Sequence, residues 1–328
     1  MTLTQLRYLI AIADSGLSIT LAAERVHATQ PGISKQLKQL EDELGFLLFS
    51  RKGRSLEAIT PAGEQVLAHA RRAVAEAANI RALAANQRGE TQGALTLVTT
   101  HTQARYVLPS AVAAVMRAFP QVSVHMQPAA EREVLARLAS GHADLAVIST
   151  ADGIPEGGLA IPLFRWRRVV VVPRSHPLAA LRRAPTLEEL AALPLLSYDS
   201  SQRPESSLRA AFAARGLQPQ LAMTAHAADL LKTYVRAGLG VGLLAEMAVG
   251  ASEDPDLHAL PAPAAVPECT TWAVLPRERV LRDYAVQLLQ ELAPQLDRHD
   301  LRRALAGHAE PAWPRPPTWI ERRRAVTS

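Results

Sequence analysis

The chain has 328 residues, of which 48% are hydrophobic and 20% charged, and this composition is ordinary for a folded protein of two or three domains. Its 36 basic and 31 acidic side chains give a formal net charge of +5, which is a weak indication of nucleic-acid binding. The single cysteine, Cys269, excludes a disulfide framework within the chain. An export signal and a membrane span of about 18 apolar residues are both missing, so a cytoplasmic protein without membrane contact is expected.

Residues 1–59 carry the pattern of a winged helix-turn-helix. An amphipathic helix stops near Gly16, and a second helix, capped by Ser18, runs through Val26. A short turn then leads to a third helix, whose apolar stripe consists of Ile33, Leu37, Leu40 and Leu44. A strand, a basic turn and another strand follow, as in a wing. On pattern alone, the alternative is an ordinary small helical bundle.

The polar face of the third helix is suited to DNA. Thr29 is placed to cap this helix, and Pro31 stands in its first turn, where a missing N–H does little harm. Gln can pair bidentately with adenine in the major groove, while Lys and Ser suit phosphate or guanine. The predicted DNA-contacting residues of this helix are Thr29, Gln30, Pro31, Ser34, Lys35 and Lys38.

Residues 60–89 are predicted to form a long dimerisation helix. Thr60 and Pro61 indicate its start, and the pattern continues to about Gln87, before a hinge at residues 89–93. A heptad seam is formed by Val66, Ala70, Ala73, Ala77, Ile80 and Ala84. A dimer would fix the spacing of two DNA-reading heads, whereas the alternative is a helix packed on its own domain.

Beyond residue 90 the pattern changes to alternating strands and helices, with one helix predicted over 103–119. Such alternation indicates an α/β fold with mostly parallel sheets and a ligand crevice at the carboxyl ends of the strands. No catalytic set of the known hydrolase types occurs, so an enzyme is not expected. Residues 297–328 are rich in proline and are predicted to form a disordered tail, in which residues 322–324 could contact DNA or an acidic partner.

The segments AAERVHATQPGISKQLKQLEDELGFLLFSR and ITPAGE closely resemble the winged helix-turn-helix of LysR-type transcriptional regulators. In that family the helix bearing Gln30, Ser34 and Lys35 reads the major groove, and the wing around Arg51 and Arg54 contacts the DNA backbone. The resemblance implies double-stranded DNA as a partner and a homodimer through the linker helix. It further implies a homotetramer, with RNA polymerase as a candidate partner.

The resemblance extends to about residue 296 and implies a two-lobed effector domain like a periplasmic binding protein of type 2. The chain would cross between the lobes near residues 163–165 and again near residues 266–268. The implied boundaries are 1–59 for the DNA-binding domain, 60–89 for the linker helix, 90–163 and 267–296 for effector lobe I, 164–266 for effector lobe II and 297–328 for the tail.

The stretch TTHTQARY, at residues 99–106, stands where a strand ends and a helix begins. Its hydroxyl and amide donors and the free N–H groups of a helix start suit a small oxyanion, although plain capping by Thr102 is the alternative. Together with KTYVRAGLGVG, it is similar to the CysB/Cbl-like sulfur-assimilation branch of the family, in which the matching residues bind sulfate or a related anion. By that resemblance the ligand-binding residues include Thr100, Thr102, Gln103 and Ser149, the last replacing the usual Thr.

Two departures from the branch bear on the ligand. Gln202 or Arg203 stands where the branch has a further Thr, and His226 replaces another Thr. Arg would add a charge and a planar fork suited to sulfate, sulfonate or carboxylate. No cofactor or metal is expected, only a small anionic effector such as sulfate, thiosulfate, a sulfated nucleotide or an organosulfonate. The alternatives are a regulator for another ligand, such as an aromatic carboxylate, and a solute-binding or transferase-like protein.

Overall fold

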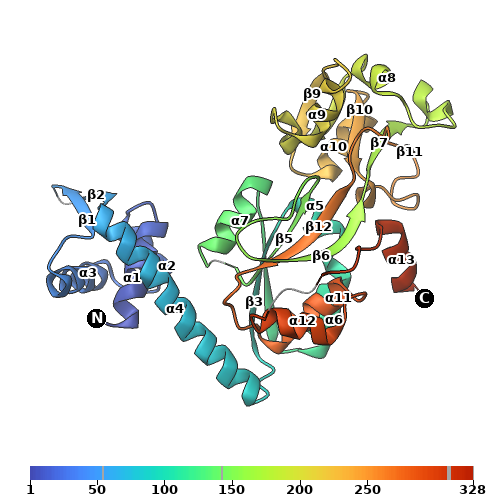
Figure 1. Cartoon of the computed structure of the whole chain (residues 1–328). Coiled ribbons are helices and arrows are strands. Elements are labelled where there is room, and N and C mark those ends of the chain that lie inside the picture. Colours follow the sequence, from blue (N-terminus) through green and yellow to red (C-terminus); the bar gives the residue numbers. More distant parts are fainter. Residues whose placement is uncertain (54, 142, 309–311, 328) are drawn as a thin grey trace. The chain divides into compact units, whose positions relative to one another are not determined.

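The computed structural model describes residues 1–53, 55–141, 143–308 and 312–327. The chain forms two compact units, Met1–Arg88 and Gly89–Ser328 (Figure 1). Arg54, one of the predicted wing residues, lies outside the described residues.

The first unit is a helix-turn-helix with a two-stranded wing and a long final helix. Side-chain oxygens at the helix starts accept hydrogen bonds from backbone N–H groups of the first turn. Ser18 caps the second helix in this way, Thr29 the third and Thr60 the fourth. Gly45 ends the third helix at a φ of 80°, a left-handed conformation that glycine adopts without strain. The elements are α1 (Leu3–Asp14), α2 (Ile19–Arg25), α3 (Gln30–Leu44), β1 (Phe49–Lys52), β2 (Ser55–Ile59) and α4 (Pro61–Gln87).

Helix α4 uses its predicted heptad seam in two different ways. Ala70 is buried and Val66 packs with it in the core of its own domain, against α1. Farther along, Ile80 of the seam is left 61% exposed, and Leu83, which lies outside the predicted seam, is 52% exposed. The N-terminal part of the seam is therefore used within the domain, and apolar surface for a partner helix remains on the C-terminal part.

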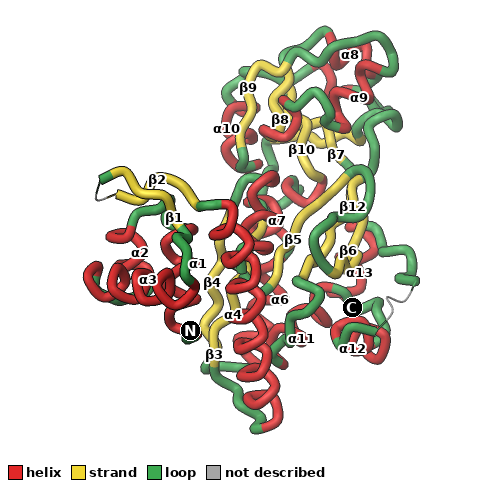
Figure 2. The backbone as a smooth tube through the Cα atoms, turned by 60° about the vertical axis from the view of Figure 1, so that its left-hand side comes forward, coloured by secondary structure: helices red, strands yellow, loops and turns green. Residues whose placement is uncertain are grey.

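The second unit contains two five-stranded sheets, which define two lobes (Figure 2). In lobe I the strand order is β4-β3-β5-β12-β6, and in lobe II it is β11-β7-β10-β8-β9. The strands of lobe I are β3 (Gly93–Thr99), β4 (Val122–Pro128), β5 (Leu145–Thr150), β6 (Leu159–Trp166) and β12 (Cys269–Leu275). Those of lobe II are β7 (Arg168–Pro173), β8 (Leu195–Tyr198), β9 (Leu221–Ala225), β10 (Val241–Ala245) and β11 (Leu257–Pro261).

Helices and 3-10 turns connect and cover these strands. In lobe I they are α5 (His101–Tyr106), α6 (Leu108–Ala118), α7 (Glu131–Ala139) and α11 (Asp283–Leu292). In lobe II they are η1 (Pro177–Ala180), α8 (Leu187–Ala191), η2 (Asp199–Gln202), α9 (Ser207–Ala213), α10 (Ala228–Arg236) and η3 (Glu246–Ala248).

The chain crosses between the lobes twice, and these crossings make both sheets mixed. It passes from β6 to β7 at Arg167 and returns between Pro261 and Cys269. Strands β3, β4 and β5 pair in parallel, as do β8, β9 and β10, whereas every pairing of β6, β7, β11 and β12 is antiparallel. The expectation of mostly parallel sheets was wrong, because strands that carry the crossings are not joined by helical crossovers.

Two further differences from the sequence prediction are local. The single helix predicted over 103–119 is two helices, α5 and α6, with a break at Val107. Pro109 lacks an N–H and its ring would clash with the carbonyl four residues earlier, so a continuous helix is disfavoured. Strands β10 and β11 were not predicted, since β10 is a short buried run directly after the glycines that end α10.

The segment after residue 296 is ordered where the structure describes it, which corrects the predicted disordered tail. It contains α12 (Arg298–Leu305) and α13 (Trp319–Thr327), and Trp313 and Trp319 pack against the core of lobe I. The backbone N–H of Arg165 donates to the carbonyl of Pro317 at 2.8 Å. The prediction of disorder rested on the proline content of the segment. The two tryptophans bury enough apolar surface to keep the segment packed on lobe I.

Candidate functional site

The N-terminal end of α3 presents the polar side chains predicted to contact DNA. Gln30, Lys35 and Lys38 are exposed, and Ser34 is half-buried. The exposed Pro31 occupies the first turn, while the exposed Thr29 accepts the N–H of Gly32 at 3.3 Å. The apolar stripe of the same helix is buried at Ile33, Leu37 and Leu40. The helix therefore carries two opposed faces, one packed in the domain and one open to a partner.

The wing is tied to α3 by a buried carboxylate that the sequence analysis did not single out. Glu41 is buried, and its Oε1 accepts the N–H of Leu48 at 2.9 Å. Its Oε2 lies 3.0 Å from Nη2 of Arg51, the predicted backbone-contacting residue of the wing. Arg51 is 41% exposed in its side chain, so it can still face a phosphate while Glu41 orients it.

A cavity of about 800 Å³ lies in the second unit and is lined from both lobes. It contains all seven residues predicted to bind the ligand, although they come from distant parts of the sequence. Its polar lining residues include Thr100, Thr102, Gln103, Ser149, Arg168, Asp199, Gln202, Arg203, Thr224 and His226. The large apolar groups among its lining are few, namely Trp166 and the ring of Tyr198.

The lobe I side of the cavity is a closed hydrogen-bond network. The hydroxyl of Thr100 donates to Oε1 of Gln103, and Nε2 of Gln103 donates to Oγ of Ser149 at 2.7 Å. The same Oγ accepts from Nε1 of Trp166 at 3.1 Å and lies 2.8 Å from the hydroxyl of Thr271. Two incoming donors occupy the acceptor positions of Ser149, so its own proton is directed to Thr271.

Thr102 does not cap helix α5, contrary to the alternative considered for it. The helix begins after Thr100, whose side chain makes no capping bond, and Thr102 lies buried in the first turn. Burial raises the pKa of Tyr198 above its usual value, and hydrogen bonds with the N–H of Ala245 and with Thr102 oppose that shift. Thr102 of lobe I and Tyr198 of lobe II therefore both line the cavity and lie close to each other.

The three predicted ligand residues of lobe II already have protein partners. Nε2 of Gln202 donates to the hydroxyl of Thr224 at 2.6 Å. A guanidinium nitrogen of Arg203 lies 3.8 Å from Glu131 of lobe I. Nδ1 of His226 lies 2.8 Å from Asp199. These side chains line the cavity, but each would exchange or share a partner on binding an anion.

Arg168 is a cavity residue that the sequence analysis missed. It is the first residue of β7, immediately before a run of four valines, and only 8% of its surface is exposed. Its guanidinium lies over the ring of Trp166, 6.0 Å from the centroid. The sequence could have indicated this residue, because a charged side chain stands at the start of an otherwise apolar strand. An arginine is seldom buried unless a partner pairs with its charge.

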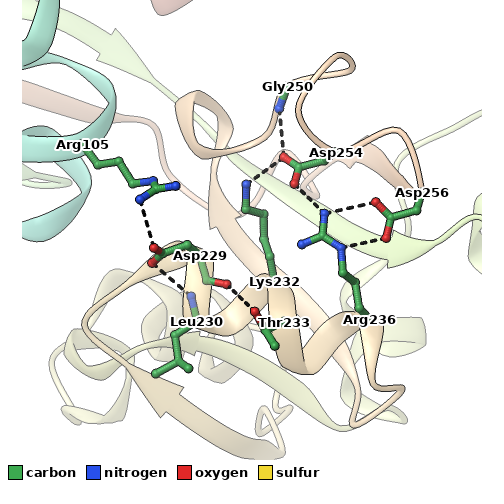
Figure 3. Close-up of polar contacts among 9 residues, drawn as sticks. All are labelled: Arg105, Asp229, Leu230, Lys232, Thr233, Arg236, Gly250, Asp254 and Asp256. Carbon is green, nitrogen blue, oxygen red and sulfur yellow. Dashed lines mark hydrogen bonds and ion pairs between the residues drawn. The ribbon is translucent and has the colours of Figure 1, made fainter.

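Ion pairs connect the two lobes and brace lobe II (Figure 3). Arg105 of α5 lies 3.2 Å from Asp229 of α10, which joins lobe I to lobe II. Within lobe II, Nζ of Lys232 donates to Asp254 at 2.7 Å, and both side chains are almost fully buried. Arg236 donates to the second oxygen of Asp254, also at 2.7 Å.

The described residues hold neither a metal site nor a membrane-spanning helix. No group of three or more His, Cys, Asp or Glu side chains in this part of the chain is arranged to hold a metal ion. No described helix is long and apolar enough to cross a membrane.

Two known families match the chain, one in each of the two structural units apart from the start of the second match at residue 88. Residues 3–64 match the family described as "Bacterial regulatory helix-turn-helix protein, lysR family". Residues 88–297 match the family described as "LysR substrate binding domain".

Several curated proteins are similar over almost the whole chain. The HTH-type transcriptional regulator CysB of Haemophilus influenzae is 38% identical, over 93% of this chain and 94% of its own. The HTH-type transcriptional regulator cbl of Escherichia coli is 34% identical, over 94% of this chain and 98% of its own. The HTH-type transcriptional regulator SsuR of Burkholderia cenocepacia is 34% identical, over 92% and 97%.

Solved structures show the same architecture. The cofactor-binding domain of the Cbl transcriptional regulator aligns with a TM-score of 0.59 at 33% identity and covers 66% of this chain and 94% of its own. A full-length OxyR variant from Pseudomonas aeruginosa aligns with a TM-score of 0.67 at 26% identity, over 91% of this chain and 99% of its own. The likeness therefore spans both the DNA-reading unit and the two-lobed unit.

Proposed function

The chain belongs to the LysR family of DNA-binding transcriptional regulators, and from that premise we propose that it senses a small anionic sulfur compound and controls genes of sulfur metabolism. Its similarity to regulators rather than enzymes sets aside the solute-binding and transferase-like alternative. The observation that carries the proposal is the convergence of Thr100, Thr102, Gln103 and Ser149 in one interlobe cavity.

The chemistry of this cavity favours an oxyanion. Hydroxyl and amide groups offer hydrogen bonds without net charge. The lining also carries the carboxylates Glu131, Asp152, Asp199 and Glu205, so the positive charge available to a ligand comes from Arg168, which has no carboxylate partner among the described residues. An aromatic carboxylate, the alternative ligand, would be better served by an apolar lining, and few large apolar groups line this cavity. A cavity of about 800 Å³ is also large for a bare tetrahedral ion, which supports a sulfated nucleotide or an organosulfonate over sulfate itself.

Ligand binding would act on DNA through the arrangement of subunits. The lining comes from both lobes, so a ligand that contacts both favours one interlobe geometry over another. The exposed Ile80 and Leu83 of α4 offer a surface for a homodimer, and the family resemblance extends this to a cytoplasmic homotetramer. A change in lobe geometry would then alter the spacing of the DNA-reading heads. RNA polymerase is a further candidate partner on the resemblance alone.

The first experiment is calorimetric titration of the full chain with sulfate, thiosulfate, several organosulfonates and the sulfated nucleotide adenosine phosphosulfate, using Thr102→Ala as the test variant. Thr102 is buried in the cavity wall, and the substitution removes its hydroxyl from the lining. We expect binding of at least one probe and a loss of about tenfold in Thr102→Ala. Absence of binding to every probe would contradict the anion-sensing proposal and leave the family assignment intact.

A second experiment addresses the DNA-reading end of α3. Lys35→Ala should weaken DNA binding and reduce the slope of log affinity against log salt by about one, if Lys35 contacts a phosphate. The matched control is Arg117→Ala, which removes one positive charge from the exposed surface of α6 in the second unit, away from the predicted DNA-reading elements. An unchanged slope in Lys35→Ala would place that side chain away from the phosphates.

A further inference from the structure

We infer that Arg168 is the residue that pairs with the negative charge of the ligand, and that the ligand presents a fully ionised oxyanion group to it. The inference rests on the proposed anion-sensing function and identifies the group that supplies the charge. It follows from the hydrogen bonds that Arg168 makes and does not make.

Arg168 is buried with most of its donors unused. Its Nη2 donates to Oγ of Ser207 at 3.3 Å. Its Nε and Nη1 are buried, yet no group among the described residues accepts a hydrogen bond from either. No carboxylate in the described part of the chain lies within ion-pair distance of this guanidinium. A buried charge in this condition is unfavourable unless a partner completes it, and the cavity that it lines provides the space for one.

Other polar groups of the cavity, unlike Arg168, already have hydrogen-bond or ion-pair partners. Thr100, Gln103 and Ser149 already satisfy one another, and Trp166 donates into the same network. The remaining arginines that line the cavity each face a carboxylate: Arg203 lies 3.8 Å from Glu131, and Arg132 lies 3.9 Å from Glu133. Arg168 is therefore the described cavity cation whose donors are ready for an incoming anion.

The position of Arg168 also defines how a ligand would be held. Its guanidinium is stacked over Trp166, and Nε1 of Trp166 bonds Ser149, so the arginine and the lobe I network share one supporting ring. Trp166 ends β6 in lobe I and Arg168 begins β7 in lobe II, one residue beyond the crossing. An anion that binds Arg168 and the lobe I hydrogen-bond network at the same time would connect the two lobes across that crossing.

The geometry of a guanidinium specifies the class of group that it takes. The N–H groups of Nε and Nη1 point away from different sides of the guanidinium plane's outline, so one oxygen cannot accept from both. A ligand must therefore offer at least two oxygens to satisfy them. Sulfate, a sulfate ester and a terminal sulfonate each provide three or more oxygens and a permanent charge. A neutral or zwitterionic group without such an oxyanion would leave the buried charge uncompensated.

The test uses the full chain and three variants: Arg168→Gln, Arg168→Lys and Arg132→Gln. The last removes the same charge from an exposed arginine that lines the same cavity, so it controls for net charge. The probes are sodium sulfate and hexanesulfonate, which distinguish a free ion from a charged group on a larger molecule. For whichever probe the wild type binds, we expect about 30-fold weaker binding or worse in Arg168→Gln. Arg132→Gln should change affinity by less than about threefold.

Thermal melting without probe separates binding from folding. Because Arg168→Gln removes an unpaired buried charge, its melting temperature should stay within about 2 °C of the wild type or rise. The upward shift that the probe produces in the wild type should disappear. Arg168→Lys keeps the charge and loses the fork, so its affinity should lie between those of Arg168→Gln and the wild type.

The outcomes that overturn the inference are distinct from those that overturn the anion-sensing proposal. If Thr102→Ala loses binding while Arg168→Gln binds as well as Arg132→Gln, the cavity binds an anion but Arg168 does not contact it. A fall of melting temperature in Arg168→Gln with affinity retained would make Arg168 a packing residue. If the wild type binds none of these probes, nor thiosulfate, nor adenosine phosphosulfate, both proposals fail together.

Discussion

The guanidinium of Arg105 on lobe I lies 3.2 Å from the carboxylate of Asp229 on lobe II, so this ion pair joins the two lobes (Figure 3). Both side chains are exposed to solvent in part, so salt screens their attraction. The pair can shift the free-energy difference between interlobe geometries slightly, but it is too weak to fix one geometry by itself. Arg203 and Glu131 make a second, looser pair between the lobes at 3.8 Å.

Removing the charge of Asp229 should therefore weaken ligand binding modestly. We expect Asp229→Asn to lower the affinity of the full chain for its anionic ligand by about two- to fivefold at low salt. The difference from wild type should vanish in roughly 0.5 M sodium chloride because an exposed pair is screened there. Glu133→Gln, which removes an equally exposed pairing carboxylate within lobe I, is the control, and an equal effect from it would dismiss the interlobe explanation.

The buried ion pair of Lys232 and Asp254 should be essential for the stability of lobe II. These side chains are 5% and 3% exposed, and Asp254 also accepts from Arg236. Asp254→Asn would leave the ammonium of Lys232 buried without its counter-charge, at a cost of about 3 kcal/mol in the free energy of unfolding. Asp256→Asn, which removes the exposed partner of Arg236, should cost below about 1 kcal/mol. Urea unfolding followed by circular dichroism would measure both.

The stability contribution of Asp254 should depend on pH. Burial by itself raises the pKa of Asp254, but the hydrogen bonds from Lys232 and Arg236 outweigh it and hold the pKa below its usual value. Because the folded pKa is lowered, this group stabilises the fold above the pKa of the unfolded chain. That contribution is lost as the pH falls through the folded pKa, so the difference between wild type and Asp254→Asn should persist at neutral pH and shrink only below about pH 4. A difference already lost at pH 6 would contradict the assignment.

Glu41 should fix the wing to the recognition helix. Glu41→Ala removes the acceptor for the N–H of Leu48 and the partner of Arg51, and it should cost about 2–3 kcal/mol in the stability of the first unit. DNA affinity measured by fluorescence anisotropy should fall because Arg51 loses its orientation. Asp42→Ala, at the exposed neighbouring position, should alter neither property measurably. Equal effects at the two positions would mean that only net charge matters.

Trp319 should hold the C-terminal segment on lobe I. Its ring lies 5.3 Å from that of Phe164, and the guanidinium of Arg322 lies over both rings, at 4.8 Å from Phe164 and 5.9 Å from Trp319. Burial lowers the pKa of Arg322 to about 10, and the two aromatic rings are its cation–π partners. Trp319→Ala should release α13 and cost about 3 kcal/mol.

Limited trypsin digestion followed by mass spectrometry would measure that release. The arginines of α13 should become cleavable in Trp319→Ala and stay protected in the wild type. Ile320→Ala is the control, since Ile320 is exposed on the same helix and its loss should leave α13 in place. Rapid cleavage of the wild type at these arginines would support the disordered tail predicted from composition.

The sequence by itself determined the local elements and the family. Capping residues such as Ser18, Thr29 and Thr60 begin helices in the structure as predicted, because capping depends on side chains one turn away. The QPGIS and THTQARY motifs indicated the LysR family, and the family comparisons confirmed it. The ligand role of the predicted cavity residues remains a proposal, since sequence can nominate donors without showing which of them already have partners.

Only the tertiary structure decided the pairings between distant residues. It placed Glu41 against Arg51, closed Gln103 onto Ser149, and left Arg168 buried without a full set of acceptors. It also showed that the proline-rich C-terminal segment is held by Trp319, which composition could not indicate. The physical reason is the same in each case: burial and the satisfaction of a polar group depend on what the fold brings next to it, and that is not written in the spacing of residues along the chain.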